Sequence, residues 1–151
     1  MEQVKDHERL IFKLLYILKR QTDKAATDYL GTLMPGDFNI TFMPYFMSIG
    51  NDGISNHALV QKIMVTKQAV SKTVKELERL GLVYTGKSET DARSIMIFLT
   101  EEGKRLHAAV AQMADTTTEE YIKLIGAKKY EQFIDTCIKI SEWHENREKM
   151  P

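Results

Sequence analysis

The stretch that decides the fold is Thr66–Val83, which reads TKQAVSKTVKELERLGLV. Its apolar residues recur three or four positions apart, as on one face of an α-helix. Thr66 is a favourable N-cap residue, and Gly81 stands where a left-handed, helix-ending residue belongs. The stretch therefore predicts a capped amphipathic helix over residues 66–80. Its inward face is expected to comprise Val70, Thr73, Val74, Leu77 and Leu80.

Two further helices are expected before this one. Ser55 is a second N-cap residue, and the helix that it starts runs through Met64, only two residues before Thr66. A shorter helix is expected to begin with Thr41 as its N-cap and Pro44 in its first turn, where the missing N–H costs little. A short helix, a turn and a second capped helix form a helix-turn-helix pattern.

A β-hairpin is expected after the helix-turn-helix. Residues 82–85 and 94–99 are rich in β-branched and aromatic side chains, and they flank the polar segment 86–93. Thr100 then caps another helix. A helix-turn-helix followed by a hairpin is the winged-helix arrangement, so we expect a mainly α fold with a small β-hairpin wing.

Long helices are expected on both sides of this region. Residues 4–30 have apolar residues at helical spacing, and four of them lie seven positions apart, which suits a helix packed against another helix: Val4, Ile11, Leu18 and Ala25. After Thr100, a helix with Leu106, Val110 and Met113 on one side is followed, beyond Gly126, by a last helix. The inward face of that last helix is expected to comprise Tyr130, Phe133, Ile134, Cys137, Ile138 and Ile140.

Composition and charge narrow the class of protein. A chain of 151 residues and 17.4 kDa, 43% hydrophobic and 28% charged, is typical of one globular domain and not of a disordered tail. Lys+Arg and Asp+Glu are both 21, which excludes a polycation of the histone kind. Residues 55–87 nevertheless carry six basic side chains against two acidic ones. This local basic region is the kind that a small DNA-binding protein shows.

The sequence has no sign of secretion, membrane insertion or catalysis. Cys137 is a single cysteine, the first residues lack a signal-peptide core, and no apolar run approaches the roughly 18 residues of a membrane span. There is no Gly-x-Ser-x-Gly motif and no glycine-rich phosphate loop. The four histidines lack the spacing of zinc ligands: His7, His57, His107 and His144. We therefore expect a cytoplasmic protein with no membrane partner, enzymatic activity, metal or cofactor.

Three strings, in this order and spacing, resemble the MarR family of bacterial transcription regulators. The first is Thr66–Val83, the second is Asp91-Ala92-Arg93-Ser94, similar to the family's Asp-x-Arg wing signature, and the third is Leu99-Thr100-Glu101-Glu102-Gly103, similar to its strand-to-helix junction. The resemblance covers about residues 40–105. It implies a homodimer that grips double-stranded DNA, with dimerisation helices in residues 1–34 and 100–151 around a winged lobe at residues 40–99.

The resemblance further implies that the 66–80 helix enters the major groove of DNA. There, the Gln68 amide can bind adenine, and Ser71 can reach a base edge or a phosphate. Side chains and helix starts suited to phosphates are Lys67, Lys72, Lys75, Ser55 and Thr66. In a non-binding interpretation, these are the ordinary polar residues of a surface helix.

The wing supplies the second set of expected DNA contacts. Arg93 can enter a narrow minor groove, and Lys87 can reach the DNA backbone. Asp91 can pair with the Arg93 guanidinium or shape the tip of the wing. The alternative is an exposed Asp–Arg pair without a DNA role, which would contribute less than about 1 kcal/mol.

Regulation by a small aromatic or anionic effector is a further implication of the resemblance. Suitable aromatic and methionine side chains, which also suit a plain core, are Tyr16, Phe42, Met43, Tyr45, Phe46 and Met47. No motif identifies ligand-binding residues. We expect a repressor that binds a pseudo-palindromic operator with half-sites about 10 base pairs apart.

Two other functional hypotheses remain open from the sequence. A winged helix can be a protein–protein interaction module, which the formal net charge of +0 favours. A redox-responsive dimer without DNA activity would use Cys137. That thiol lies on the apolar stripe of the last helix, however, and a buried, inert cysteine is expected there.

Overall fold

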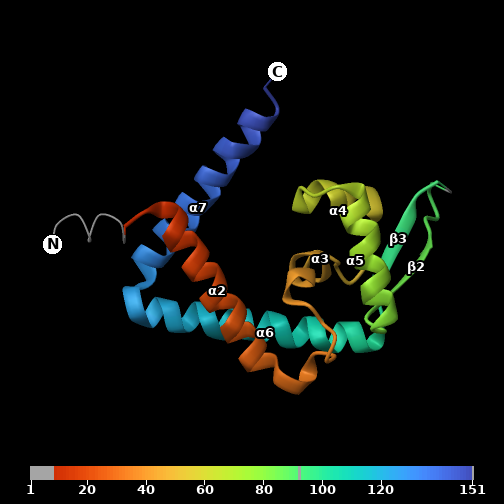
Figure 1. The fold of residues 1–151 in the computed structure, drawn as a ribbon, viewed down its shortest axis with the longest axis horizontal. Helices are drawn as coiled ribbons and strands as arrows, with labels where there is room; N and C mark the ends of the chain where they lie inside the picture. Colours follow the sequence, from red (N-terminus) through yellow and green to blue (C-terminus); the bar gives the residue numbers. More distant parts are fainter. Residues whose placement is uncertain (1–8, 92, 151) are drawn as a thin grey trace. The chain divides into compact units, whose positions relative to one another are not determined.

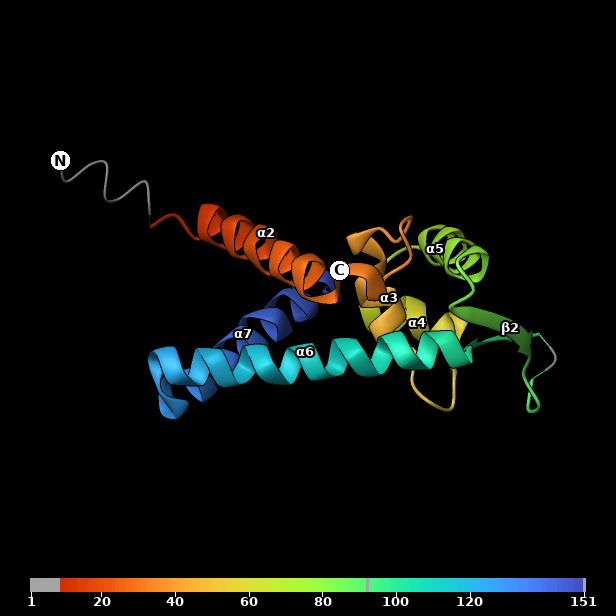
Figure 2. The same ribbon diagram turned by 90° about the horizontal axis from the view of Figure 1, so that it is seen from below.

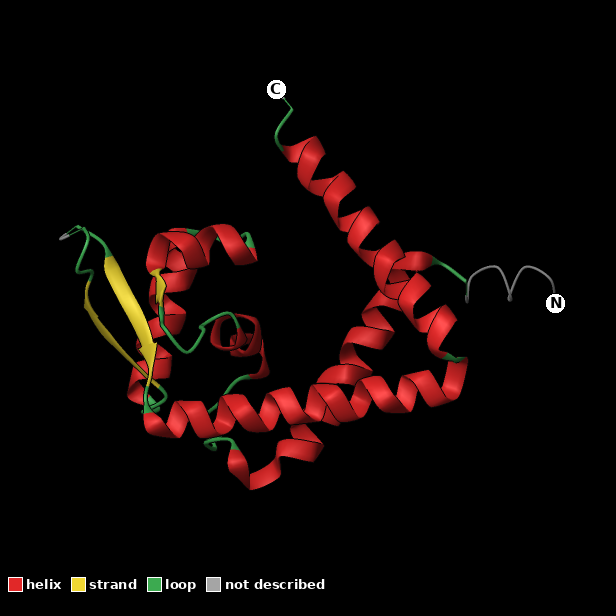
Figure 3. Cartoon of the chain, turned by 180° about the vertical axis from the view of Figure 1, so that it is seen from behind, coloured by secondary structure: helices red, strands yellow, loops and turns green. Residues whose placement is uncertain are grey.

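The structure, a computed structural model, describes residues 9–91 and 93–150. It divides into two compact units, Met1–Ala111 and Gln112–Pro151. Helices predominate, as Figure 3 shows, and the three strands form one small sheet. The elements are α2 (Ile11–Leu30), η1 (Gly31–Leu33), η2 (Ile40–Phe42), α3 (Met43–Met47), β1 (Ile54–Ser55), α4 (Asn56–Ile63), α5 (Lys67–Arg79), β2 (Val83–Lys87), β3 (Ile95–Leu99), α6 (Glu101–Ile125) and α7 (Ala127–Glu148).

The first unit contains the predicted winged helix. Helix α5 packs against α3, α4 and strand β2 (Figure 1). Its buried residues, Val70, Thr73, Val74 and Leu77, confirm four of the five inward positions, whereas Leu80 is half-buried. Phe46 of α3 and Leu59 of α4 are fully buried in the same unit. The mainly α fold with a small β-hairpin wing is confirmed.

The helix boundaries confirm two predicted caps and correct a third. The side chains of Ser55 and Thr66 cap α4 and α5 as expected. Thr41 is not an N-cap: Asn39 Oδ1 accepts a hydrogen bond from the Thr41 N–H at 2.9 Å and starts the 3₁₀ turn η2, which precedes α3. The amide of Asn39 competes successfully because it reaches an N–H two residues ahead.

The turn of the helix-turn-helix contains an unusual backbone conformation. Met64 was expected inside the helix, but α4 ends at Ile63, and Met64 adopts the left-handed region with φ 55°. Its N–H still bonds to the Val60 carbonyl, so the residue closes the helix while redirecting the chain. Gly81, with φ 75°, ends the next helix as predicted.

The sheet contains one strand that the sequence did not reveal. Strands β2 and β3 form the predicted antiparallel hairpin, with Val83 opposite Leu99 and Lys87 opposite Ile95. The two-residue strand β1 pairs with the other edge of β3, giving the order β1-β3-β2. The hairpin projects beyond the helices in two perpendicular views (Figure 1 and Figure 2). Because β1 leads directly into α4, this pairing ties the start of the helix-turn-helix to the base of the wing.

The junction between β3 and α6 is closely packed against the end of α5. Thr100 Oγ1 donates a hydrogen bond to the Gly81 carbonyl at 2.6 Å and accepts one from the Gly103 N–H at 3.0 Å. A Cβ atom on Gly103 would lie 2.0 Å from the Leu82 carbonyl oxygen. The string Leu99–Gly103 therefore serves packing, with a hydroxyl that holds two elements together and a glycine that lets them approach.

The second unit consists of the end of α6, a break at Gly126 with φ 88°, and α7. Within it, the hydroxyls of Thr118 and Tyr130 lie 3.3 Å apart. The prediction of an inward apolar face on α7 is wrong for the isolated chain, because all 22 residues of this helix are described and none is buried. Cys137, expected to be buried, is exposed for the same reason. Val4, expected in the first helix, lies outside the described residues.

Candidate functional site

The outward face of α5 presents the polar residues selected from the sequence. Val70, Val74 and Leu77 hold the opposite face in the core. The helical period then turns the intervening positions to solvent. All five of the predicted side chains are exposed: Lys67, Gln68, Ser71, Lys72 and Lys75. This face therefore combines three ammonium groups with an amide and a hydroxyl.

Thr66 and Ser55, which were expected to contact phosphates, are the N-cap residues of α5 and α4. Thr66 Oγ1 accepts a hydrogen bond from the Ala69 N–H at 3.1 Å, and Ser55 Oγ accepts one from the Ala58 N–H at 3.1 Å. Ser55 is half-buried and belongs to β1, whereas Thr66 is exposed. Both hydroxyls are thus engaged within the chain, and only Thr66 is openly accessible.

The wing tip is organised by its own polar side chains. Asp91 Oδ1 accepts a hydrogen bond from the Arg93 N–H at 3.0 Å, and the Asp91 carbonyl accepts one from the Ser94 N–H at 3.0 Å. Ser88 Oγ accepts from the N–H groups of Thr90 and Asp91, each at 3.3 Å. Of the two roles considered for Asp91, the structure shows tip shaping. Ala92, between them, lies outside the described residues.

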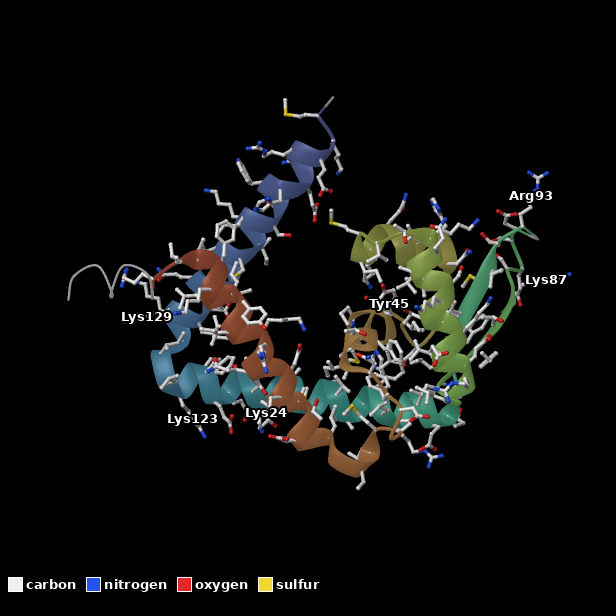
Figure 4. All side chains as sticks on the ribbon, viewed as in Figure 1. Lys24, Tyr45, Lys87, Arg93, Lys123 and Lys129 are labelled. Atoms are coloured by element: carbon white, nitrogen blue, oxygen red, sulfur yellow. The ribbon has the colours of Figure 1, made fainter. Side chains whose placement is uncertain are left out.

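The two cations of the wing remain available. Lys87 and Arg93 are exposed, and Figure 4 shows both side chains directed away from the hairpin. Within residues 9–91 and 93–150, neither belongs to an ion pair. Their charges are therefore not neutralised inside the described part of the chain.

A hollow brings part of α5 together with the wing tip. It is lined by Asn56, His57, Val60, Lys67, Arg93 and Ser94. Lys67 and Arg93, 26 positions apart in the sequence, thus border one depression. A second hollow between α5 and the sheet has Ser71 and Lys75 on its rim and Ile95 and Ile97 on its wall. Among the predicted residues, the two hollows therefore bring Lys67 beside Arg93 of the wing, and Ser71 and Lys75 beside the sheet.

Asn56 and His57 are lining residues that the sequence did not indicate. His57 was expected to be an ordinary surface histidine, and no spacing rule connects it with Arg93 of the wing, 36 positions further along the chain. The β1–β3 pairing creates the proximity, because it holds the start of α4 beside the hairpin. Only the fold could have identified these two residues.

Arg79, which also projects outward from α5, differs from the lysines. Its guanidinium bonds to Glu76 Oε2 at 3.0 Å and to Asp37 Oδ2 at 3.4 Å. The hydrogen bond and the charge of Glu76, followed by Asp37, raise the pKa of Arg79 above its ordinary value. This cation is therefore matched by carboxylates of the same unit and contributes little free positive charge.

Two of the aromatic residues considered for an effector pocket, the half-buried Phe42 and the buried Phe46, belong to one aromatic cluster. Phe38 contacts Phe42 and Phe46 edge-to-face, at centroid distances of 5.8 and 6.1 Å. Phe46 contacts His107 in the same way at 5.7 Å. Tyr16, in contrast, is exposed on α2. The cluster stabilises the lobe through aromatic packing.

Residues 9–91 and 93–150 contain no helix that is long and apolar enough to cross a membrane. They also contain no group of three or more histidine, cysteine or acidic residues arranged to hold a metal ion.

The geometry agrees with known proteins at the level of the family. A model described as "MarR family" matches residues 45–94, the segment from α3 to the wing tip. Transcription regulators and MarR-type solved structures are similar over larger parts of the chain. Residues 45–94 of the chain therefore match the MarR family.

Two curated relatives give the extent of the similarity. The chain is 28% identical to the transcriptional regulator HosA of Escherichia coli O157:H7 over 88 residues, 58% of its length. That alignment spans 65% of HosA, slightly less than two thirds. This chain is also 27% identical to the HTH-type transcriptional regulator SarZ of Staphylococcus aureus over 111 residues, 72% of each chain.

Solved structures support the same fold. FabT of Streptococcus pneumoniae in complex with DNA superimposes with a TM-score of 0.75 at 20% identity, covering 93% of this chain and 98% of FabT. MepR of S. aureus in a DNA complex gives a TM-score of 0.69 at 20% identity, with 85% and 94% coverage. At these identities the likeness shows the winged-helix fold.

Proposed function

We propose that this chain is a sequence-specific DNA-binding transcription regulator that acts as a homodimer on a pseudo-palindromic operator. One observation carries the proposal: Lys67, on the exposed polar face of α5, borders the same hollow as the wing cation Arg93, which belongs to no ion pair within the described residues. In this proposal α5 enters the major groove and the wing contacts the neighbouring minor groove.

The polar residues on the exposed face of α5 fall into two groups, those that can contact bases and those that can contact phosphates. Gln68 and Ser71 can form hydrogen bonds with base edges, whereas Lys67, Lys72 and Lys75 supply the phosphate contacts that orient a helix in the groove. The matched guanidinium of Arg79 lies outside this set. The FabT and MepR structures contain DNA, which supports this use of the fold.

Exposed apolar side chains support the homodimer. On α2, Phe12 is 84% exposed and Ile11 57%, and on α7 Phe133 and Trp143 are 51% and 52% exposed. Apolar surface of this extent is typical of an interface. A second copy of the same chain would cover it, and two-fold symmetry would place two half-sites about 10 base pairs apart.

We further propose repression, because occupation of a promoter needs no additional surface, and modulation by a small aromatic or anionic molecule. The neighbour PcaV of Streptomyces coelicolor was solved with its natural ligand, at a TM-score of 0.70 and 15% identity. An effector would act by binding one arrangement of the two lobes better than another.

The test is selection from a random duplex library with the purified full chain at low salt, followed by sequencing of the bound fraction. Recovery of an inverted repeat with half-sites about one helical turn apart would support a dimeric DNA reader. Absence of enrichment together with absence of salt-sensitive DNA retention would overturn the proposal. The interaction-module hypothesis would then gain weight.

Salt dependence separates the two classes of function quantitatively. For DNA, the logarithm of the binding constant falls with the logarithm of salt concentration with a slope of about −0.9 per phosphate contacted. A protein partner would give a shallower slope. Titration against a recovered duplex at several salt concentrations therefore distinguishes them.

A further inference from the structure

We propose that the hollow lined by Asn56, His57, Lys67 and Ser94 binds one backbone phosphate of DNA, and that protonation of His57 makes DNA affinity dependent on pH. This inference rests on the proposed function. It adds Asn56, His57 and Ser94 to the phosphate contact already expected for Lys67, and it assigns a regulatory role to His57.

The hollow has the polar groups that a phosphate requires. Lys67 brings an ammonium group from the start of α5, Ser94 a hydroxyl from the wing, and Asn56 and His57 an amide and an imidazole from α4. Arg93 borders the same depression from the wing tip. None of the described lining residues is acidic. Oxygen atoms of a phosphate can therefore find several donors without facing a carboxylate.

Side chains, rather than the end of helix α4, carry this site. Ser55 Oγ already accepts the hydrogen bond of the Ala58 N–H at 3.1 Å. Asn56 Oδ1 accepts the hydrogen bond of the His57 N–H at 3.0 Å. Two backbone donors at this helix start are thus occupied, and the free donors of the hollow come mainly from Lys67 and His57.

The location matches the path of a DNA backbone. The hollow lies where α5 meets the wing, that is, between the element proposed for the major groove and the element proposed for the minor groove. A phosphodiester strand separates these two grooves. A protein that inserts one element into each groove therefore has a backbone phosphate between them.

His57 is the titratable group that gives the site its pH dependence. Histidine is the side chain that ordinarily changes charge between pH 5 and 8. A phosphate in the hollow favours the protonated imidazole, and by linkage the protonated imidazole favours the bound phosphate. DNA binding should accordingly strengthen as pH falls from 8 to 6.

The neighbours of His57 add positive charge and no competing carboxylate inside the hollow. Helix α4 packs against α3, α5, β1 and β3. The segments α3, β1 and β3 contain no charged residue. Two nearby charged groups line the hollow: Lys67 of α5 and Arg93 of the wing. The charged or titratable groups of the neighbouring segments that do not line the hollow are Tyr45 of α3, Asp52 before β1, Lys62 of α4, and Lys72, Lys75, Glu76, Glu78 and Arg79 of α5.

The experiment uses a fluorescein-labelled 40-base-pair duplex of random sequence, because a phosphate contact does not depend on base sequence. Anisotropy titrations of the full chain at pH 6 and pH 8, each at several salt concentrations, would compare wild type with His57→Gln and His57→Lys. His144→Gln, in an exposed histidine of α7, is the matched control. Circular dichroism of each variant would verify folding, which an exposed position such as His57 should preserve.

Wild type and His144→Gln should bind about two- to five-fold more tightly at pH 6 than at pH 8, as expected for one exposed ion pair. The salt slope should be steeper by about one phosphate contact at pH 6. His57→Gln should abolish the difference, and His57→Lys should give the tighter affinity at both pH values. Equal pH dependence in wild type and His57→Gln would overturn this inference while leaving DNA binding intact. Absence of DNA binding at either pH would overturn the proposed function as well.

Discussion

Helix α5 and helix α7 both carry apolar residues that were expected to face inward, but the two helices differ in their surroundings. Four of the thirteen residues of α5 are buried, and they pack against α3, α4 and β2. None of the twenty-two residues of α7, all of them described, is buried, although Phe133, Ile138 and Ile140 were expected to face inward. The winged lobe completes its own core, whereas α7 leaves its apolar side chains uncovered.

The comparison shows that an apolar stripe on a helix predicts burial of that face but does not say which element, of the same chain or of another, covers it. For α5, the covering elements lie in the same unit of the chain. For α7, we propose that a second copy provides the cover. The two helices should therefore respond differently to equivalent substitutions.

Removal of a phenylalanine from each region is the strongest way to break this comparison. Phe46 is 0% exposed and Phe133 is 51% exposed. Phe46→Ala should lower the free energy of unfolding by about 3–5 kcal/mol, through lost burial and the cavity left behind. Phe133→Ala should change it by less than about 1 kcal/mol at protein concentrations where the chain is monomeric. Urea denaturation would measure both.

The same pair tests the proposed dimer. Phe133→Ala should raise the concentration at which the dimer dissociates, measured by sedimentation equilibrium, because the substitution removes interface contacts. Glu142→Ala, at another exposed position of α7, is the control. A wild-type chain that stays monomeric at every concentration would contradict the homodimer.

A second test asks whether DNA binding belongs to the lobe. Arg93→Ala should weaken DNA affinity about ten-fold or more, since this unpaired guanidinium is proposed to enter the minor groove. Arg79→Ala, which removes a guanidinium matched by Glu76 and Asp37, should change affinity by less than about two-fold. Anisotropy titrations with a recovered operator would measure both variants. Equal losses would mean that only the net charge of the lobe matters, and an unchanged Arg93→Ala affinity would remove the wing from the mechanism.

The smallest expected effect concerns the start of α5. Thr66→Ala removes the acceptor for the Ala69 N–H and should cost about 1 kcal/mol of unfolding free energy. Thr66→Ser keeps a hydroxyl and should recover most of this loss. Thermal denaturation would show the difference. Equal melting temperatures for the alanine and serine variants would show that the observed hydrogen bond contributes nothing measurable to lobe stability.

Much of the fold was predictable because its signals are local. The caps at Ser55 and Thr66 and the left-handed Gly81 depend on hydrogen bonds and backbone angles within a few residues. The period of α5 likewise follows from side chains three and four positions apart. By contrast, Asn39 replaced Thr41 as a capping residue because neighbouring polar side chains compete for the same N–H groups.

The candidate site was predictable only in part. Lys67, Gln68, Ser71, Lys72 and Lys75 were selected from the face of one helix, and their exposure follows from its period. Asn56 and His57 could not be selected, since they join Lys67 and Arg93 through the pairing of β1 with β3. That pairing involves only two residues of β1, too few to give a sequence pattern.

The sequence by itself determined the helix-turn-helix, the hairpin and the polar face of α5, because hydrogen-bond caps and residue periodicity act over short distances. Only the tertiary structure decided that Asp91 shapes the wing tip, that Arg79 is matched by Asp37 from a distant loop, and that α7 is uncovered. These features depend on which segments meet in space. Such tertiary contacts arise from packing across the whole unit, and no local sequence pattern encodes them.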